Sequence, residues 1–435
     1  MHILIIGGGV AGLALAGLID NSKHRVVILE QDSPEDFAKK WHWHDNLNIA
    51  ELRRLGYTDV LPQSFPEQED RIAASPSGKF KLRFKMKKPF IYEQVYRPVL
   101  LSSLYEKARE KSNLRYDTHV ESLLIENGRT AGAVLLDGQE IRADLTIDCT
   151  GITELSRPLL GELYRGDEEI MHVFRGLFPR EQKDSPPAAD CITLKPDGNA
   201  GFSRYTIDAA GKTDVFVSCL GSVKSDWAND ILNGLFKEHS SWDAPNIPAG
   251  KWGEYVIPTR CPLTQLVFDG FALLGDSACM AIPYIGTGIV NTLHGAKILA
   301  NVINGFGERD SADINKLWKY QERYYRKVAK SVWRSYILNR WLQTADNETL
   351  ENLFSSRIFG SADAQRIFTG RFLSLAPQTI FRRSLQLMLH PKLLLSIIAM
   401  FAQAIWAEEC GRSIPEKYDE KRIAAWQQKM KRALD

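Results

Sequence analysis

The chain has 435 residues, of which 44% are hydrophobic and 25% charged, as expected of a globular protein with two or more packed regions. Its 55 Lys and Arg residues nearly balance its 53 Asp and Glu residues, so no overall basic field would attract nucleic acid. The six cysteines form no CxxC pair, and the first residues read as a strand rather than a targeting segment. We therefore expect reduced thiols, no metal site and a cytoplasmic location.

The first thirty residues predict a phosphate-binding cradle. "HILIIGGGVAGLALAGLI" combines an apolar strand, the spacing Gly7-x-Gly9-x-x-Gly12 and an Ala- and Leu-rich helix. Glycine at these positions lets the backbone approach a pyrophosphate, and the helix N-terminus offers free N–H groups and partial positive charge. A second strand ends at Glu30, where a carboxylate would bind the ribose diol. This pattern alone indicates a dinucleotide without separating NAD from FAD.

The stretch "KKWHWHDNLNIAELRRLGY" at 39–57 alternates two Trp and two His residues. A strand would place His42 and His44 on one face, whereas a loop could bring them close to the cofactor. Three interpretations stay open: aromatic packing over the cofactor, substrate contact or proton transfer by an imidazole, and a metal site for which no third ligand is evident.

The middle of the chain predicts alternating helix and strands. Arg97 precedes an amphipathic helix, and "NGRTAGAVLLDGQEI" is typical of a hairpin with Asn-Gly and Asp-Gly turns. "ADLTIDCTG" predicts a buried strand ending at Gly151. Residues 165–262 alternate short strands with turns, which favours an antiparallel sheet, and residues 70–95 are expected to add further strands to it.

The segment "LLGDSACMAIPYIGTG" at 273–288 predicts a buried strand, a turn and a helix start. Asp276 follows the strand, and Pro283, Gly286 and Gly288 precede the helix. From 306 onward the pattern is helical, with an apolar run at 393–407 that is shorter than a bilayer span. These last helices are expected to complete a core, to cover an apolar tunnel or to make a shallow peripheral membrane contact.

The order of these motifs resembles the FAD-dependent oxidoreductases of the p-hydroxybenzoate hydroxylase fold, which include aromatic hydroxylases, flavin-dependent halogenases, lycopene cyclases and geranylgeranyl reductases. The resemblance covers about residues 1–330. It implies an α/β fold with a Rossmann-type FAD-binding domain, a second domain built on an antiparallel substrate sheet, and a helical C-terminal region. The expected divisions are 1–69, 96–164 and 263–305 for the FAD domain, 70–95 and 165–262 for the substrate sheet, and 306–435 for the helical region.

The resemblance also implies roles for individual residues. The ADP half of FAD would be held at the N-terminal cradle, Arg97 would approach the cofactor, and the 273–288 segment would hold the ribityl chain and the isoalloxazine ring. In that segment, N–H groups freed by Gly286 and Gly288 would stabilise the negative charge of the reduced ring. The implied cofactor residues are Gly7, Gly9, Val10, Ala11, Gly12, Glu30, Arg97, Gly275, Asp276, Pro283, Gly286, Thr287, Gly288 and Ile289. The catalytic candidates are His42, His44 and Tyr284.

Two departures from the aromatic hydroxylases bear on the reaction. Cys279 follows Gly-Asp-Ser-Ala, and Gly295 lies in the next helix, which resembles the geranylgeranyl reductase and halogenase branch more closely. The resemblance therefore implies reduction of a carbon–carbon double bond in a hydrophobic small molecule. The alternative is an O₂-dependent monooxygenase or halogenase of a natural-product pathway, with NAD(P)H as a transient electron donor. A flavin-binding carrier without turnover is the third hypothesis.

Overall fold

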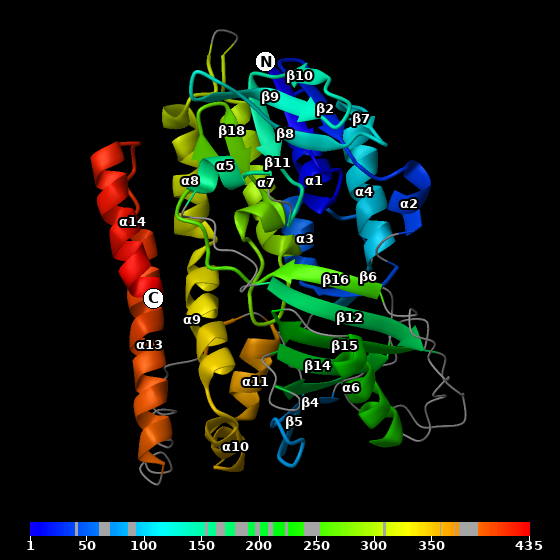
Figure 1. Ribbon diagram of the computed structural model, residues 1–435, viewed down its shortest axis with the longest axis vertical. Coiled ribbons are helices and arrows are strands. Elements are labelled where there is room, and N and C mark those ends of the chain that lie inside the picture. The colour runs from blue at the N-terminus through cyan, green and yellow to red at the C-terminus, as the bar shows by residue number, and fades with distance from the viewer. Residues whose placement is uncertain are drawn as a thin grey trace.

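The computed structural model describes residues 1–39, 42–60, 70–85, 93–152, 155–161, 170–178, 190–195, 201–207, 212–221, 225–238, 253–307, 310–356, 358–369, 371–373 and 390–435. Its upper part in Figure 1 is built on a six-stranded sheet in the order β17-β18-β11-β1-β2-β7. All neighbouring strands in it are parallel except β17 and β18. The strands are β1 (His2–Ile6), β2 (Arg25–Leu29), β7 (Ser112–Arg115), β11 (Leu145–Asp148), β17 (Val267–Phe268) and β18 (Phe271–Leu273).

Strand β1 lies inside this sheet because its sequence is apolar on both faces. Ile3, Leu4, Ile5 and Ile6 are all buried, a continuous run typical of a parallel strand covered on two sides. Helix α1 (Val10–Leu18) packs against α4 (Arg97–Arg109) and α7 (Ile289–Ile303), and its small residues allow this close approach. A three-stranded sheet lies beside the six-stranded one and consists of β8 (Val120–Glu126), β9 (Arg129–Leu135) and β10 (Glu140–Arg142). Asn127 and Gly128, in the predicted turn between β8 and β9, have positive φ.

The lower part in Figure 1 is a seven-stranded sheet in the order β16-β12-β15-β14-β13-β4-β5. It is antiparallel except where β4 runs parallel to β13. One face packs against α6 (Ser225–Glu238) through Phe174, Tyr205 and Val217. The other face is turned toward the six-stranded sheet. The strands are β4 (Asp70–Ala74), β5 (Lys81–Lys85), β12 (Ile170–Phe178), β13 (Asp190–Leu194), β14 (Gly201–Ile207), β15 (Thr213–Leu220) and β16 (Gly253–Pro258).

Short elements connect the two sheets. Strands β3 (His44–Leu47) and β6 (Glu93–Tyr96) form an antiparallel pair, after which α4 begins. The remaining short elements are α2 (Pro34–Lys39), α3 (Ile49–Leu55), α5 (Arg157–Leu160) and the 3₁₀ helix η4 (Gly275–Ala278).

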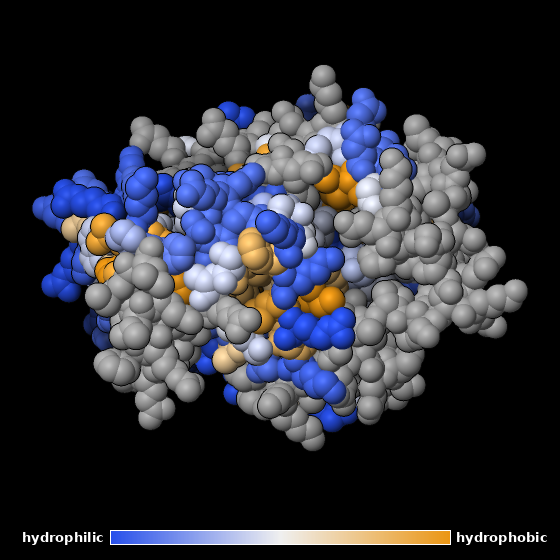
Figure 2. Space-filling view, turned by 90° about the horizontal axis from the view of Figure 1, so that it is seen from below, coloured by the Kyte–Doolittle hydropathy of each residue, from blue (hydrophilic) through white to orange (hydrophobic). Residues whose placement is uncertain are grey.

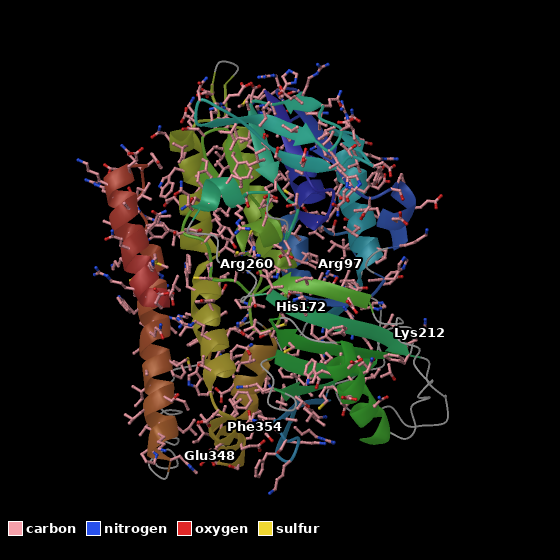
Figure 3. All side chains as sticks on the ribbon, viewed as in Figure 1. Arg97, His172, Lys212, Arg260, Glu348 and Phe354 are labelled. Carbon is pink, nitrogen blue, oxygen red and sulfur yellow. The ribbon has the colours of Figure 1, made fainter. Side chains whose placement is uncertain are left out.

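Helices from the C-terminal part of the chain flank both sheets along one side of the molecule (Figure 1). Trp318, Trp333 and Tyr320 are fully buried, so these helices complete the core, as predicted. Phe354, labelled in Figure 3, packs with Ala364 against Phe84 of the seven-stranded sheet. The helices are α8 (Ile314–Lys327), α9 (Lys330–Thr344), α10 (Asn347–Ser355), α11 (Ser361–Phe368), α13 (Pro391–Arg412) and α14 (Glu420–Leu434).

Helix α13 is longer than the apolar run suggested. It packs on α9 with one face, while Leu395, Ile398, Ile405 and Trp406 remain exposed. Within the described ranges it is the one helix whose length and apolar composition would suit a membrane span, a test that core helices also pass.

Seen from below, the molecule shows apolar side chains gathered near the middle of the view and hydrophilic ones around them (Figure 2). The cytoplasmic or peripheral location stays a prediction.

The predicted fold class is confirmed. Strands β4 and β5 join strands that follow residue 165 in one sheet, as the sequence suggested. The exact division into three regions stays a prediction.

Candidate active site

A cavity of about 1240 Å³ lies between the two large sheets. The turn after β1, the end of β2 and the start of α7 form one end of it, and the inward face of the seven-stranded sheet forms the other. Arg97 lies between these two parts (Figure 3). Most of the predicted cofactor residues line this cavity: Gly7, Gly9, Val10, Ala11, Glu30, Arg97, Gly275, Asp276, Gly286, Thr287, Gly288 and Ile289.

The turn after β1 is shaped by its glycines. Gly7 has φ 104°, and a Cβ on it would lie 2.5 Å from the Cys149 carbonyl oxygen. A Cβ on Gly12 would lie 2.0 Å from the Gly7 carbonyl oxygen, so Gly12 serves the close packing of α1 and does not line the cavity. A Cβ on Gly9 would meet nothing within 4 Å, so the chain itself does not need glycine there. The open space beside Gly9 suits the close approach of a phosphate to the backbone at the start of α1.

Glu30 ties the end of β2 to this turn. Its Oε2 accepts a hydrogen bond from Gly8 N at 2.8 Å, and its Oε1 accepts one from Asp32 N at 3.1 Å. Both bonds hold the carboxylate at the cavity wall in the position expected of a ribose ligand.

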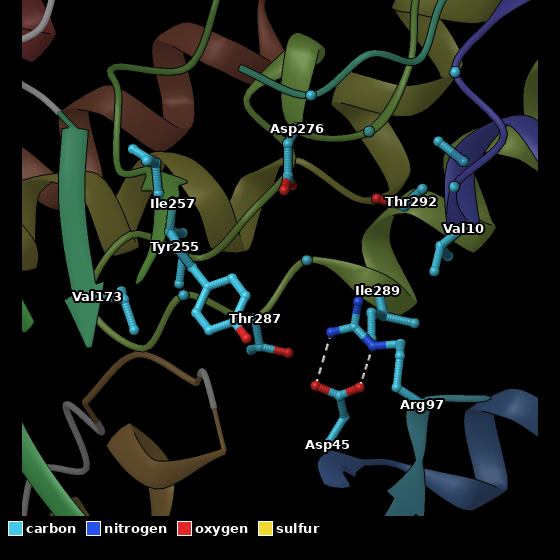
Figure 4. A pocket seen from close by; sticks show the side chains of 18 of the residues that line it. Val10, Asp45, Arg97, Val173, Tyr255, Ile257, Asp276, Thr287, Ile289 and Thr292 are labelled. Carbon is cyan, nitrogen blue, oxygen red and sulfur yellow. Dashed lines mark hydrogen bonds and ion pairs between the residues drawn. The ribbon is translucent and has the colours of Figure 1, made fainter. Parts of the chain in front are cut away.

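Arg97, the first residue of α4, and Asp45 of β3 form a two-point ion pair. Arg97 Nη2 donates to Asp45 Oδ1 at 2.8 Å, and Arg97 Nε donates to Asp45 Oδ2 (Figure 4). Burial acts to lower the pKa of Arg97, but the charge and hydrogen bonds of Asp45 outweigh it and raise that pKa. Arg97 therefore faces the cavity as a fixed cation, with its guanidinium 5.6 Å from the ring centre of Trp43.

Asp276 projects into the same cavity from η4 (Figure 4). Its carboxylate is accessible from the cavity, yet the surrounding walls displace bulk water. Burial therefore raises the pKa of Asp276, and the positive charge of Arg97 opposes this rise. A polar ligand that replaced the missing water would stabilise the ionised carboxylate.

The segment from Pro283 to Gly288 differs in part from the prediction. Gly286 N does not stay free for a flavin ring, because it donates to the Ile282 carbonyl oxygen at 2.9 Å in a tight turn. Gly286 has φ 63°, which that turn requires, while Gly288 is the N-cap of α7. Pro283 and Tyr284 are not among the residues that line the cavity, and Tyr284 is buried.

The two histidines occupy different environments. His44 lines the cavity with its ring centre 5.0 Å from that of Tyr96. His42 lies at the surface, where its Nδ1 pairs with Tyr96 Oη at 2.6 Å and its Nε2 with the Ala38 carbonyl oxygen at 2.9 Å. The geometry thus leaves His44 as the one catalytic candidate of the three that reaches the cavity.

The sequence did not single out the charged face of the seven-stranded sheet. Arg71, Arg175 and Arg204 line the cavity from β4, β12 and β14, and Asp214 lies beside them on β15. Arg175 pairs with Asp214 through Nε at 2.9 Å and Nη2 at 2.5 Å, and its Nη2 also donates to the His44 carbonyl oxygen at 3.0 Å. The available signal was an Arg at an inward position of an otherwise apolar strand, as in "VFRGLF".

Two families of known proteins are similar to this chain in sequence. Residues 2–186 match the family described as lycopene cyclase protein, and residues 256–348 match squalene epoxidase. Squalene epoxidase 4 of Arabidopsis thaliana is 26% identical over 84% of this chain and 71% of its own length. The FAD-dependent monooxygenase ausM of Emericella nidulans is 22% identical over 86% of this chain and 82% of its own length.

Solved structures agree on the fold. A geranylgeranyl bacteriochlorophyll reductase-like protein of Thermoplasma acidophilum superposes with a TM-score of 0.70 at 15% identity, over 92% of this chain and 98% of its own. HpxO of Klebsiella pneumoniae, solved with FAD, superposes with a TM-score of 0.62 at 18% identity, over 85% of this chain and 97% of its own. The chain is an FAD-dependent oxidoreductase with the p-hydroxybenzoate hydroxylase fold.

The residues of this oxidoreductase fit FAD. The open cradle at Gly9, the carboxylate of Glu30 and the helix start at Gly288 lie along one cavity, and Asp276 projects between them. Cys149 also lines the cavity, and burial raises the pKa of its thiol well above the usual range, so the sulfur is a packed neutral group there. The role of each residue toward FAD stays a prediction.

Proposed function

We propose that this FAD-dependent oxidoreductase is a monooxygenase that acts on a small organic molecule bound against the seven-stranded sheet. The observation that carries the proposal is the character of that sheet face, where guanidinium groups and aromatic rings share the wall of the cavity. A pure hydrocarbon substrate would displace water from these polar side chains without offering them a hydrogen bond, which costs free energy. A substrate with polar atoms would pair with them.

Each end of the cavity has its own task in this proposal. The Gly9 turn, Glu30 and the start of α7 would hold FAD, which supplies electron transfer and activation of O₂ when bound. Arg97, fixed by Asp45, would keep positive charge beside the cofactor site. Tyr255, Val173 and Ile257 would orient the apolar body of the substrate and exclude water. His44 is placed to hold or move a proton at its imidazole.

The sequence relatives named squalene epoxidase and FAD-dependent monooxygenase support this reaction class. Reduction of a carbon–carbon double bond is kept as a second candidate, since the geranylgeranyl reductase-like structure superposes over 92% of this chain. NAD(P)H is the proposed electron donor in both cases.

Product analysis separates the two reactions. The FAD-loaded protein is incubated with NADH or NADPH and a panel of small aromatic and isoprenoid compounds, with isotopically labelled O₂ in one arm and without oxygen in the other. A monooxygenase transfers one labelled oxygen atom to the product and makes no product without oxygen. A product that gains two hydrogen atoms in the anaerobic arm, and no label in the other, would replace the monooxygenase by the reductase.

A further inference from the structure

The cavity runs across the strands of the seven-stranded sheet rather than along them. In the strand register, Arg175 of β12 lies opposite Phe216 of β15, which lies opposite Arg204 of β14. Ile192 of β13 follows Arg204 in the same row, and all four residues line the cavity. The cavity therefore crosses neighbouring strands one after another, leading away from β16.

The length of this path follows from the strand order. Ile257 of β16 lines the cavity beside the turn before α7, since a Cβ on Gly286 would lie 3.0 Å from Ile257 Cδ1. Arg71 lines it from β4, which is the fifth strand along the sheet from β16. Neighbouring strands lie about 4.8 Å apart, so the path is about 24 Å long. An extended chain of roughly 18 carbon atoms has this length, at about 1.25 Å per bond.

Helix α11 covers the inward face of the sheet next to β4 and β5 (Figure 1). Phe84 of β5 lies opposite Arg71 in the register, so the two side chains share that face. The ring of Phe368, the last residue of α11, packs edge-on against Phe84 with centres 5.1 Å apart. Phe368 and Thr369 also line the cavity, and among the described residues that follow α7 they are the two that do so. The far end of the path thus meets a helix end.

The end of α11 is attached to its surroundings on two sides. Gln365 Nε2 donates to the Lys85 carbonyl oxygen of β5 at 2.5 Å. Arg366 Nε donates to the Phe372 carbonyl oxygen at 2.8 Å, and the Phe372 ring packs against Phe401 of α13 with centres 5.4 Å apart. Because these contacts join α11 to both β5 and α13, a ligand that reaches the end of α11 meets a fixed wall.

We propose that Phe368 is a specificity-determining residue that, together with Thr369, sets the maximum length of the substrate. The substrate is accordingly elongated and lies across the strands, with one end near the start of α7 and the other against the Phe368 ring. A longer chain would have to displace a packed ring or leave apolar groups in water, and either change lowers affinity. This inference rests on the proposed function only in that the cavity against the sheet holds the substrate.

Competitive binding measures the length limit without any turnover. The oxidised, FAD-loaded protein is equilibrated with a mixture of linear primary amides of about 8 to 24 carbon atoms, which covers the length of the path on both sides. Bound amides are separated by gel filtration and quantified by gas chromatography. Affinity in the wild type should rise with each added methylene group, by up to about fourfold, and fall by about tenfold or more beyond about 18 carbon atoms. If no amide binds, or if affinity does not fall within the series, the inference is overturned.

Variants assign the length limit to Phe368. Phe368→Ala should move the limit toward longer chains by about three carbon atoms, because the removed ring is about 4 Å deep. Phe368→Trp should move it toward shorter chains. Phe359→Ala is the matched control, because Phe359 packs with Phe354 in the same aromatic cluster, is partly buried like Phe368 and is not among the residues that line the cavity. The wild-type limit in Phe368→Ala, or an equal shift in Phe359→Ala, would overturn the assignment.

Two safeguards keep the outcome clear. Circular dichroism and FAD content show whether each variant is folded. Where Phe368→Ala is not folded, Phe368→Trp decides, since a shorter limit supports the end wall and an unchanged limit overturns it. Binding to the oxidised protein needs neither O₂ nor an electron donor, so a length limit that follows Phe368 without any oxygenation would contradict the proposed reaction alone. Oxygenation with a length limit that is the same in every Phe368 variant would contradict the end wall alone.

Discussion

Arg97 and Asp45 join the start of α4 to β3 through two parallel hydrogen bonds, one of them 2.8 Å long between Nη2 and Oδ1. Both side chains are largely buried, with 17% and 16% of their surface exposed. This pair fixes the cation at the wall of the cavity, where β3 and the start of α4 lie between the two large sheets.

A double-mutant cycle should detect this pair. Asp45→Asn, Arg97→Gln and the double variant are compared with the wild type by urea denaturation, with FAD in excess. We expect a coupling free energy of about 1–3 kcal/mol, since each single variant leaves a partly buried charge without its partner. Additive single effects would show that the two side chains contribute to stability independently.

Gly9→Ala should separate cofactor binding from folding. The added methyl group meets nothing within 4 Å in the protein, and the Gly9 backbone lies in an extended region that alanine can adopt. The apo protein should lose about 1 kcal/mol or less, as for a changed N-cap. The methyl group would collide with the pyrophosphate, so FAD affinity should fall by about tenfold or more.

The control for that experiment is Gly12→Ala. Here the methyl group would lie 2.0 Å from the Gly7 carbonyl oxygen, so the apo protein itself should be destabilised. FAD retention and thermal unfolding of apo and loaded protein are measured for both variants. Wild-type FAD affinity in Gly9→Ala would mean that the phosphates do not lie at this turn.

Substituting alanine for two helical glycines should change the stability of the protein in opposite directions. In Gly411→Ala the new methyl group would lie 2.6 Å from Trp333 Nε1, where α13 packs on α9, and we expect a loss of about 1–3 kcal/mol. In Gly234→Ala nothing lies within 4 Å, so the higher helix propensity of alanine should stabilise α6 by up to about 1 kcal/mol. Thermal unfolding of the two variants checks the signs, and an equal response would contradict the tight packing of α13.

Stability should depend on pH through His24. This side chain is 4% exposed, and burial, together with the nearby N-terminal charge, lowers its pKa below the usual 6.5. The unfolded chain therefore binds a proton more readily than the folded one. The stability that comes from keeping His24 uncharged in the folded state is fully present above pH 6.5. It is lost as the pH falls from 6.5 toward the folded-state pKa.

Urea denaturation between pH 5 and pH 8 measures this effect. His24→Gln should reduce the loss of unfolding free energy between pH 6.5 and pH 5. Substitution of the exposed His119 by Gln should leave that loss as in the wild type. A His24→Gln profile with the same slope as the wild type would remove His24 as the cause.

The sequence singled out the cavity-lining residues of the glycine turn better than those of the seven-stranded sheet, and there is a physical reason. Gly7, Gly9 and Glu30 act through local backbone geometry, which leaves a fixed spacing in the chain. Arg71, Arg175 and Arg204 are brought onto one sheet face by strand pairing between distant segments, and each residue alone resembles a solvated surface group. Likewise, the alternation in "WHWH" could not reveal that His42 turns to the surface and His44 to the cavity.

The position of α7 in the chain has a consequence for the order of biosynthesis. The cradle at Gly7–Gly12 leaves the ribosome long before β18 and α7, which complete its sheet and its cavity and end at Leu273 and Ile303. A nascent chain shorter than this would expose the apolar surface of β11 and α1. FAD capture is thus expected late, after most of the polypeptide has been made, and chains halted before α7 would be substrates for chaperones rather than half-built holoenzymes.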